Sequence, residues 1–205
     1  MDPPDHTRIR GIVTREFTVR RIERLRAGAR EALADLLDHL ESGDRSADLV
    51  AELTSRFPAA VVGELLGVSE SDRMEFQGWA SQLLGITSVT PEEGLAAMAN
   101  LAEYVRGLIA ERRRRPVDDL FGVLVQAHDE HGRLTDDELV TFGITLLAAG
   151  FETTADQMAN SLFVLLAYDA YRELVENPEV VPAAVEELVR YGVPVVIAEN
   201  PTKFS

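Results

Sequence analysis

The sequence contains no cysteine among its 205 residues. Without a thiol the chain cannot form a disulfide, bind zinc or an iron–sulfur cluster through thiolates, or use a cysteine as a nucleophile. Apolar residues nevertheless make up 46% of the chain, which is sufficient for a packed core and unlike a disordered sequence. The length favours one large domain or two small ones.

Basic residues are scarce, with 20 lysines and arginines against 35 acidic residues and a net charge of −15. Residues 1–30 hold eight arginines and four acids, a charge of +4, which leaves −19 on the rest of the chain. An acidic body argues against nucleic acid as the main partner. The basic first segment suits an acidic cofactor, an acidic protein or simply a solvated helical face.

Long uninterrupted hydrophobic runs are also missing. The most apolar stretch, residues 139–166, is interrupted by Glu152 and Asp156, so a membrane span is not expected. The opening residues MDPPDH are polar and do not resemble a signal peptide. We therefore expect a cytoplasmic protein without a membrane partner.

Strand signals are absent, and helix start and stop signals recur along the chain, which predicts an all-α, mainly helical fold. Thr90 and Thr135 each begin a capping box, and Gly43 and Gly67 end helical patterns. The arginine run at 112–115 closes a helix, where positive charge favours the helix dipole. The patterns predict helices over residues 22–40, 57–66, 69–84, 91–115, 118–128, 135–168 and 182–191.

The longest predicted helix carries an unusual segment, Ala149-Gly150-Phe151-Glu152-Thr153-Thr154. Glycine in a helix interior costs about 1 kcal/mol relative to alanine. A threonine hydroxyl can bond a backbone carbonyl three or four residues back, and an acid beside an alcohol can relay protons in a dry site. The alternative is a solvent-facing Glu152 and a helix–helix contact at Gly150.

Two weaker signals lie near the ends of the chain. His6 and Arg10 are four residues apart, so they share a helix face and could clamp a dianion; the alternative is an ordinary polar helix. Glu187 and Arg190 are spaced for an ion pair, although such pairs are common and usually weak.

In this order, these segments resemble the cytochrome P450 family of the soluble bacterial type. Residues 2–10 resemble the opening of its C helix, 57–68 the helix before its mobile lid, 149–154 its I-helix oxygen-activation motif and 185–191 its K helix. The resemblance implies a partial P450 domain over residues 1–194 and a divergent tail over 195–205. It also implies a long central I helix, with most sheet strands and the cysteine loop missing.

The resemblance implies haem as cofactor and assigns roles to matching positions. His6 and Arg10 would contact the haem propionates, and Ala149 and Gly150 would lie against the haem face. Glu152 and Thr153 would be catalytic, delivering protons during oxygen activation. None of these residues is an iron ligand, and the thiolate ligand of the family is absent from this chain.

Further roles follow from the same resemblance. Ile144 and Leu147 would face the substrate, and Glu187 and Arg190 would form a buried structural ion pair. The partners implied are a small-molecule substrate of secondary metabolism and a ferredoxin-type redox protein.

Three hypotheses follow from the sequence. The first is a truncated P450 monooxygenase, such as a gene remnant or mis-called frame, inactive alone because its cysteine ligand is absent. The second is a haem-free P450-like scaffold that stabilises a partner enzyme such as a glycosyltransferase. The third is a helical fragment without a stable native state.

Overall fold

The computed structural model describes residues 18–43, 46–83, 89–131 and 135–191, and within these ranges it contains helices and no strand, which confirms the all-α prediction. No helix in this part of the chain is long and apolar enough to span a bilayer. The elements are α2 (Val19–Ser42), the π-helix η1 (Val50–Thr54), α3 (Arg56–Leu66), α4 (Glu70–Leu83), α5 (Pro91–Arg114), α6 (Leu120–His131), α7 (Asp136–Ala167), α8 (Ala170–Glu176), the 3-10 turn η2 (Pro178–Val180) and α9 (Val181–Tyr191).

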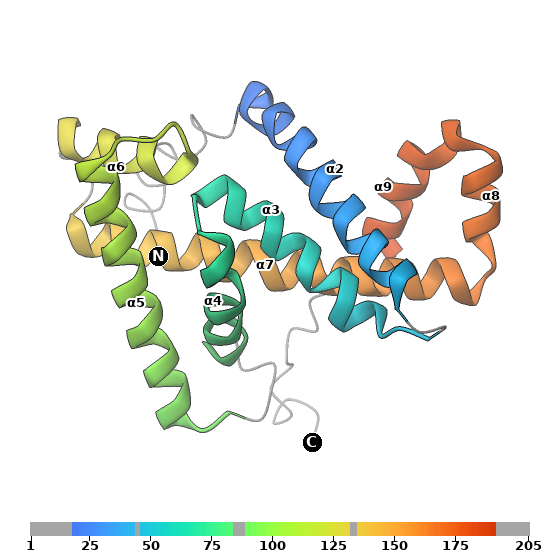
Figure 1. The fold of residues 1–205 in the computed structure, drawn as a ribbon, viewed down its shortest axis with the longest axis horizontal. Helices are drawn as coiled ribbons and strands as arrows, with labels where there is room; N and C mark the ends of the chain where they lie inside the picture. Colours follow the sequence, from blue (N-terminus) through green and yellow to red (C-terminus); the bar gives the residue numbers. More distant parts are fainter. Residues whose placement is uncertain (1–17, 44–45, 84–88, 132–134, 192–205) are drawn as a thin grey trace, which may run out of the picture.

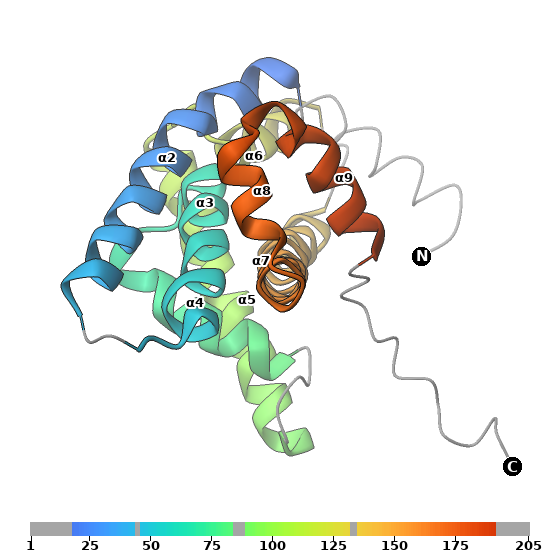
Figure 2. The same ribbon diagram turned by 90° about the vertical axis from the view of Figure 1, so that its right-hand side faces the viewer.

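Helix α7 is the axis of the molecule (Figure 1). It has 32 residues, so at about 1.5 Å per residue it crosses the whole domain. Helices α3, α4, α5 and α6 pack against it, and α2 packs on the outer side of α3. Figure 2, which looks nearly along α7, shows α8 and α9 beside its C-terminal end.

The core surrounds the first two-thirds of α7, where its buried residues run from Leu139 to Ala155. Partners from α3 to α6 close this core; the largest are Leu66, Phe76, Leu101, Leu120, Phe121 and Leu124. In contrast, no side chain described in α2, α8 or α9 is buried. The middle of α7 is therefore enclosed by the core, while its last turns, from Asp156 on, carry half-buried and exposed side chains.

The helix boundaries largely follow the sequence signals. Thr90 and Thr135 both form complete capping boxes, with Glu93 and Glu138 respectively. Gly67 ends α3 in the left-handed region at φ +72°, a conformation that favours glycine. The sequence patterns missed η1 and α8, which are short and bury few or no side chains.

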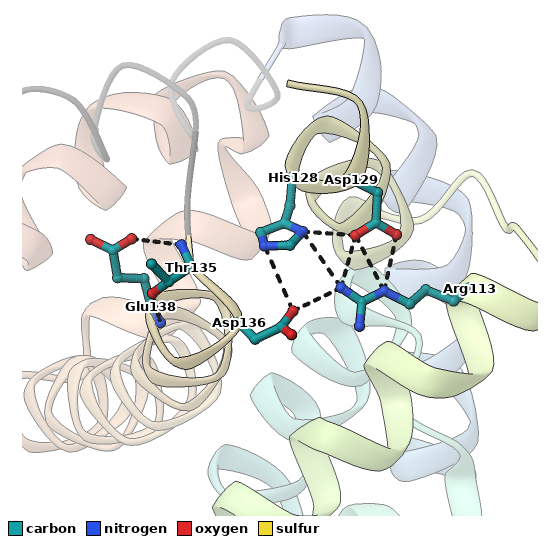
Figure 3. Close-up of polar contacts among 6 residues, drawn as sticks. All are labelled: Arg113, His128, Asp129, Thr135, Asp136 and Glu138. Carbon is teal, nitrogen blue, oxygen red and sulfur yellow. Dashed lines mark hydrogen bonds and ion pairs between the residues drawn. The ribbon is translucent and has the colours of Figure 1, made fainter. Parts of the chain in front are cut away.

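A polar cluster fixes the N-terminal end of α7 against α5 and α6 (Figure 3). Arg113 of α5 donates to both carboxylate oxygens of Asp129 and, at 2.8 Å, to Oδ1 of Asp136. Nδ1 of His128 lies 2.7 Å from the Asp129 carboxylate. One guanidinium thus joins three helices at the start of α7.

We expect Asp129→Asn to flatten the acid branch of the stability profile. Hydrogen bonds from Arg113 lower the pKa of Asp129 to about 2. A carboxyl whose folded pKa is depressed stabilises the fold above its unfolded pKa, near 4, and this contribution is lost as the pH falls toward 2. Because the pair is partly exposed, the variant loses roughly 0.5–1 kcal/mol at pH 7. Urea unfolding between pH 2 and 7 measures both effects.

Asp137→Asn is the matched control, since Asp137 is an exposed acid in the first turn of α7. Its free energy of unfolding at pH 7 should stay within about 0.5 kcal/mol of that of the unmodified chain. Equal acid slopes for Asp129→Asn and the unmodified chain would contradict a stabilising role for the Arg113 cluster.

Candidate functional site

The segment singled out in the sequence lies at the middle of α7, where the helix passes α4. Phe151 is 1% exposed and meets the ring of Phe76 edge-on, with 6.4 Å between ring centroids. This apolar contact fixes the separation of α4 and α7 beside the next residue, Glu152. The local sequence thus places an acid at the edge of a packed core.

Glu152 is buried, with 8% of its surface exposed, so it is not the solvent-facing acid of the alternative interpretation. The hydroxyl of Ser81, in the last turn of α4, donates to its Oε1. Burial raises the pKa of Glu152, the Ser81 hydrogen bond lowers it, and the charge of Asp156 raises it again. A carboxyl with a raised pKa can exchange protons nearer neutral pH.

The adjoining face of α7 is open and carries small side chains. Thr145, Ala149 and Thr153 follow each other at intervals of four residues, and all three are exposed. The hydroxyls of Thr145 and Thr153 donate to carbonyls one turn back, at 2.8 Å and 2.7 Å. This three-residue strip is therefore a surface of short side chains, and its two threonine hydroxyl protons are already hydrogen-bonded to the helix backbone.

Glu152 and Thr153 consequently lie on different sides of α7. The carboxyl of Glu152 is bonded toward α4, whereas the hydroxyl of Thr153 lies on the exposed strip. The structure does not bring the two predicted catalytic groups into direct contact. Thr154 also bonds one turn back, to the carbonyl of Gly150 at 2.9 Å, as the sequence interpretation expected of a threonine here.

Gly150 lies against α3. A Cβ at this position would meet Cγ2 of Val62 at 3.3 Å, a close contact between the two helices. The helix–helix contact that the sequence left open is therefore present. Of the two residues predicted to lie against a cofactor face, Ala149 is on the open strip and Gly150 faces Val62.

The two residues predicted to face a substrate lie inside the described helices. Ile144 and Leu147 are 7% and 1% exposed and belong to the hydrophobic core shared with α5 and α6. Packing among these helices accounts for their apolar character, and their role toward a substrate stays a prediction from the family resemblance. The residues that face outward in this part of α7 are Thr145 and Ala149.

The Glu187–Arg190 pair lies on the surface of the described helices. The guanidinium and carboxylate form two hydrogen bonds, at 2.7 Å and 2.5 Å, so the spacing was interpreted correctly. Their side chains are 60% and 69% exposed, however, because α9 buries none of its residues. Among the described residues it is a surface pair on α9, and its place in a buried network stays a prediction from the family resemblance.

Two predicted site residues, His6 and Arg10, lie outside the described residues, as does the tail 195–205. In the part of the chain that is described, no group of three metal-ligating side chains comes together. Ser81 and Phe76 were missed by sequence reasoning. They lie about 70 residues before their partners in α7, and no local pattern marks a serine that bonds so distant an acid.

The curated relatives and the solved structures that match this chain include bacterial cytochrome P450s. No protein-family model matches the chain. It is 45% identical over 192 residues to nocardicin C N-oxygenase from Nocardia uniformis subsp. tsuyamanensis, covering 93% of this chain and 48% of that protein. It is 41% identical to mycinamicin IV hydroxylase/epoxidase from Micromonospora griseorubida, with the same coverage. The chain thus spans about half the length of the curated relatives it matches.

A solved structure shows the same likeness in three dimensions. The LnmA cytochrome P450 hydroxylase from the leinamycin biosynthetic pathway of Streptomyces atroolivaceus S-140 matches with a TM-score of 0.88 and 44% identity. The match covers 94% of this chain and 50% of that chain. The described helices therefore adopt the arrangement found in half of that protein.

Proposed function

We propose, from its homology to bacterial cytochrome P450s over at least 93% of its length, that this chain forms the oxygen-activating half of a haem monooxygenase. The observation that carries the proposal is the buried, serine-bonded Glu152 next to an open strip of small side chains on the central helix. A proton-exchanging acid and a surface for a flat ligand are thereby joined on one rigid element.

The strip fits the face of a haem group. Thr145, Ala149 and Thr153 have small side chains, and their exposure leaves room for a planar ligand. The threonine hydroxyls are hydrogen-bonded internally, so an apolar ring system would leave none of their protons unpaired. Haem, when bound, supplies the iron chemistry that activates oxygen. We extend the proposal to His6 and Arg10 as partners of its propionates.

Glu152 and Thr153 would handle protons in this site. The raised pKa of Glu152 increases the fraction of its carboxyl that carries a proton near neutral pH. The Thr153 hydroxyl donates its own hydrogen to the Ala149 carbonyl, which leaves its oxygen free to accept a hydrogen bond from a group on the strip. One residue would then exchange protons and the other would orient a polar atom.

The substrate class and partners are part of the same proposal. The relatives' names describe an N-oxygenase acting on nocardicin C and a hydroxylase/epoxidase acting on mycinamicin IV. We propose a small organic substrate of secondary metabolism, electron delivery by a ferredoxin-type protein, and action in the cytoplasm. Because the chain has no cysteine, we also propose that alone it does not carry out thiolate-dependent oxidation.

Haemin titration tests the role of the strip. We expect haemin to quench the fluorescence of Trp79, the one tryptophan of the chain. Ala149→Leu should weaken binding about tenfold, because the longer side chain would clash with a ring lying on the strip; such overpacking costs about 1–3 kcal/mol, and 1.4 kcal/mol is a factor of ten. When the haemin-loaded sample is reduced under carbon monoxide, we expect no thiolate-type Soret band.

Ala99→Leu is the matched control, since Ala99 is an exposed alanine on α5, away from the strip. Its haemin affinity should equal that of the unmodified chain. Equal affinities for Ala149→Leu and Ala99→Leu would remove the strip from the proposal, and a thiolate-type band would contradict the proposed incapacity.

One observation favours the haem-free scaffold as a second candidate. A cleft of about 410 Å³ opens between α2, η1, α7 and α9 and is lined mainly by apolar side chains, including Leu33, Leu53, Met158, Leu162, Val185 and Leu188. Such a surface suits a protein partner. A haemin affinity that is unmeasurable, together with a stable complex with a co-expressed glycosyltransferase on size exclusion, would favour this function over the first.

A further inference from the structure

The contact between Ser81 and Glu152 joins α4, which buries few of its residues, to α7, which buries many. In α4, only Phe76 and Ala80 are buried, and Ser81 follows them in the last turn. In α7, Phe151 and Glu152 are both buried. The interface between the helices therefore includes an aromatic pair, Phe76 with Phe151, and a polar pair, Ser81 with Glu152.

The Ser81 hydroxyl is the hydrogen-bond partner of the Glu152 carboxyl among the described residues. Among the described residues, the charge that acts on Glu152 is that of Asp156, one turn further along α7, and it is repulsive. From α4 the group that faces Glu152 is the neutral Ser81 hydroxyl. No described arginine or histidine pairs with Glu152, so the carboxyl is not held as a permanent anion by a cation.

A serine hydroxyl has a property that a cationic partner lacks. It donates to an ionised carboxylate, and it can rotate to accept from the same group once that group is protonated. Lysine and arginine donate only, so they favour the ionised form strongly. A neutral hydroxyl can keep an acid in one place while its proton is gained and lost.

We propose that Ser81 is a positioning residue for Glu152, holding its carboxyl toward α4 in both protonation states. The inference deepens the proposed function and rests on it for the role of Glu152 in proton exchange. In this arrangement Ser81 touches no substrate and acts through Glu152. The hydroxyl opposes the effect of burial, so the acid remains able to ionise although it lies at the edge of the core.

The test is a pH titration of the Glu152 side-chain carboxyl by carbon-13 NMR, with Glu152→Gln identifying the signal by its loss. Ser81→Ala removes a hydrogen bond that is present in both protonation states but is stronger to the ionised carboxylate, so the pKa of Glu152 should rise. A hydrogen bond of typical net strength corresponds to about a three- to tenfold higher proton affinity. Ser81→Thr keeps the hydroxyl and should restore the original titration.

Ser71→Ala is the matched control on the same helix. The Ser71 hydroxyl bonds Asp72 at 3.0 Å rather than Glu152. This variant should therefore leave the Glu152 titration unchanged and raise the pKa of Asp72, which the hydrogen bonds of Ser69 and Ser71 now lower.

The inference is overturned if Ser81→Ala and the unmodified chain titrate alike at Glu152. It is also overturned if Ser81→Thr behaves as Ser81→Ala, because the hydroxyl would then not be the group responsible. Haemin is not needed for this measurement. Failure of the haemin titration would count against the proposed function and leave the positioning of Glu152 to be decided by the carboxyl titration alone.

Discussion

Arg112→Ala is expected to lower the free energy of unfolding by about 3–5 kcal/mol, because it leaves the nearly buried carboxylate of Asp119 without its cationic partner. The Arg112 and Asp119 side chains are 6% and 10% exposed, and Nη2 lies 2.6 Å from Oδ2. The same guanidinium donates to the Gly67 carbonyl at 2.9 Å. Asp119 in turn accepts from the backbone N–H of Gly122, in the first turn of α6. One side chain thus ties the ends of α3 and α5 to the start of α6.

Urea unfolding followed by circular dichroism measures this loss, with Arg114→Ala as the control. Arg114 lies two residues further along α5 and is exposed, so its replacement should stay within about 0.5 kcal/mol of the unmodified chain. Asp119→Ala should also destabilise strongly. The double variant should lose less than the sum of the two, by about 0.5–3 kcal/mol for partners in contact. Additive losses would show that the pair does not act as a unit.

The run of arginines shows where sequence reasoning reached its limit. Residues 112–115 were interpreted as positive charge at a helix C-terminus, and α5 does end there. A helix turns by about 100° per residue, so successive side chains face different surroundings. Arg112 enters a buried ion pair, Arg113 joins the cluster at the start of α7, and Arg114 is exposed. Which arginine becomes structural is decided by the packing of α3, α6 and α7.

The candidate site could likewise be predicted from the sequence only where local residue patterns determine it. Capping boxes and Gly67 marked the helices because these signals act over three or four residues. The segment at 149–154 was recognised from residue types that are unfavourable inside an apolar helix. The burial of Ile144 and Leu147, the contact of Gly150 with Val62 and the bond from Ser81 to Glu152 depend on other helices. Only the three-dimensional arrangement supplies them.

Phe151→Ala is expected to be comparably destabilising, and it tests whether the core holds the site in shape. Phe151 is 1% exposed, and deleting such a ring costs about 3–5 kcal/mol through lost burial and the remaining cavity. Its edge-on contact with Phe76 adds about 0.5–1.5 kcal/mol beyond area. A domain of this kind has a total stability of about 5–15 kcal/mol, so the variant loses a large share of it.

Phe163→Ala separates this effect from the loss of any aromatic ring in α7. Phe163 lies on the same helix but is 72% exposed, so its replacement should change the free energy of unfolding by no more than about 0.5 kcal/mol. Phe76→Ala should destabilise nearly as much as Phe151→Ala. The double variant should lose less stability than the sum of the two single losses, because the Phe76–Phe151 contact can be lost only once. Similar losses for Phe151→Ala and Phe163→Ala would contradict the packing of α4 on α7. Non-additive losses would show that the aromatic pair fixes the distance between α4 and α7 at which Ser81 reaches Glu152, because both contacts lie in the same interface.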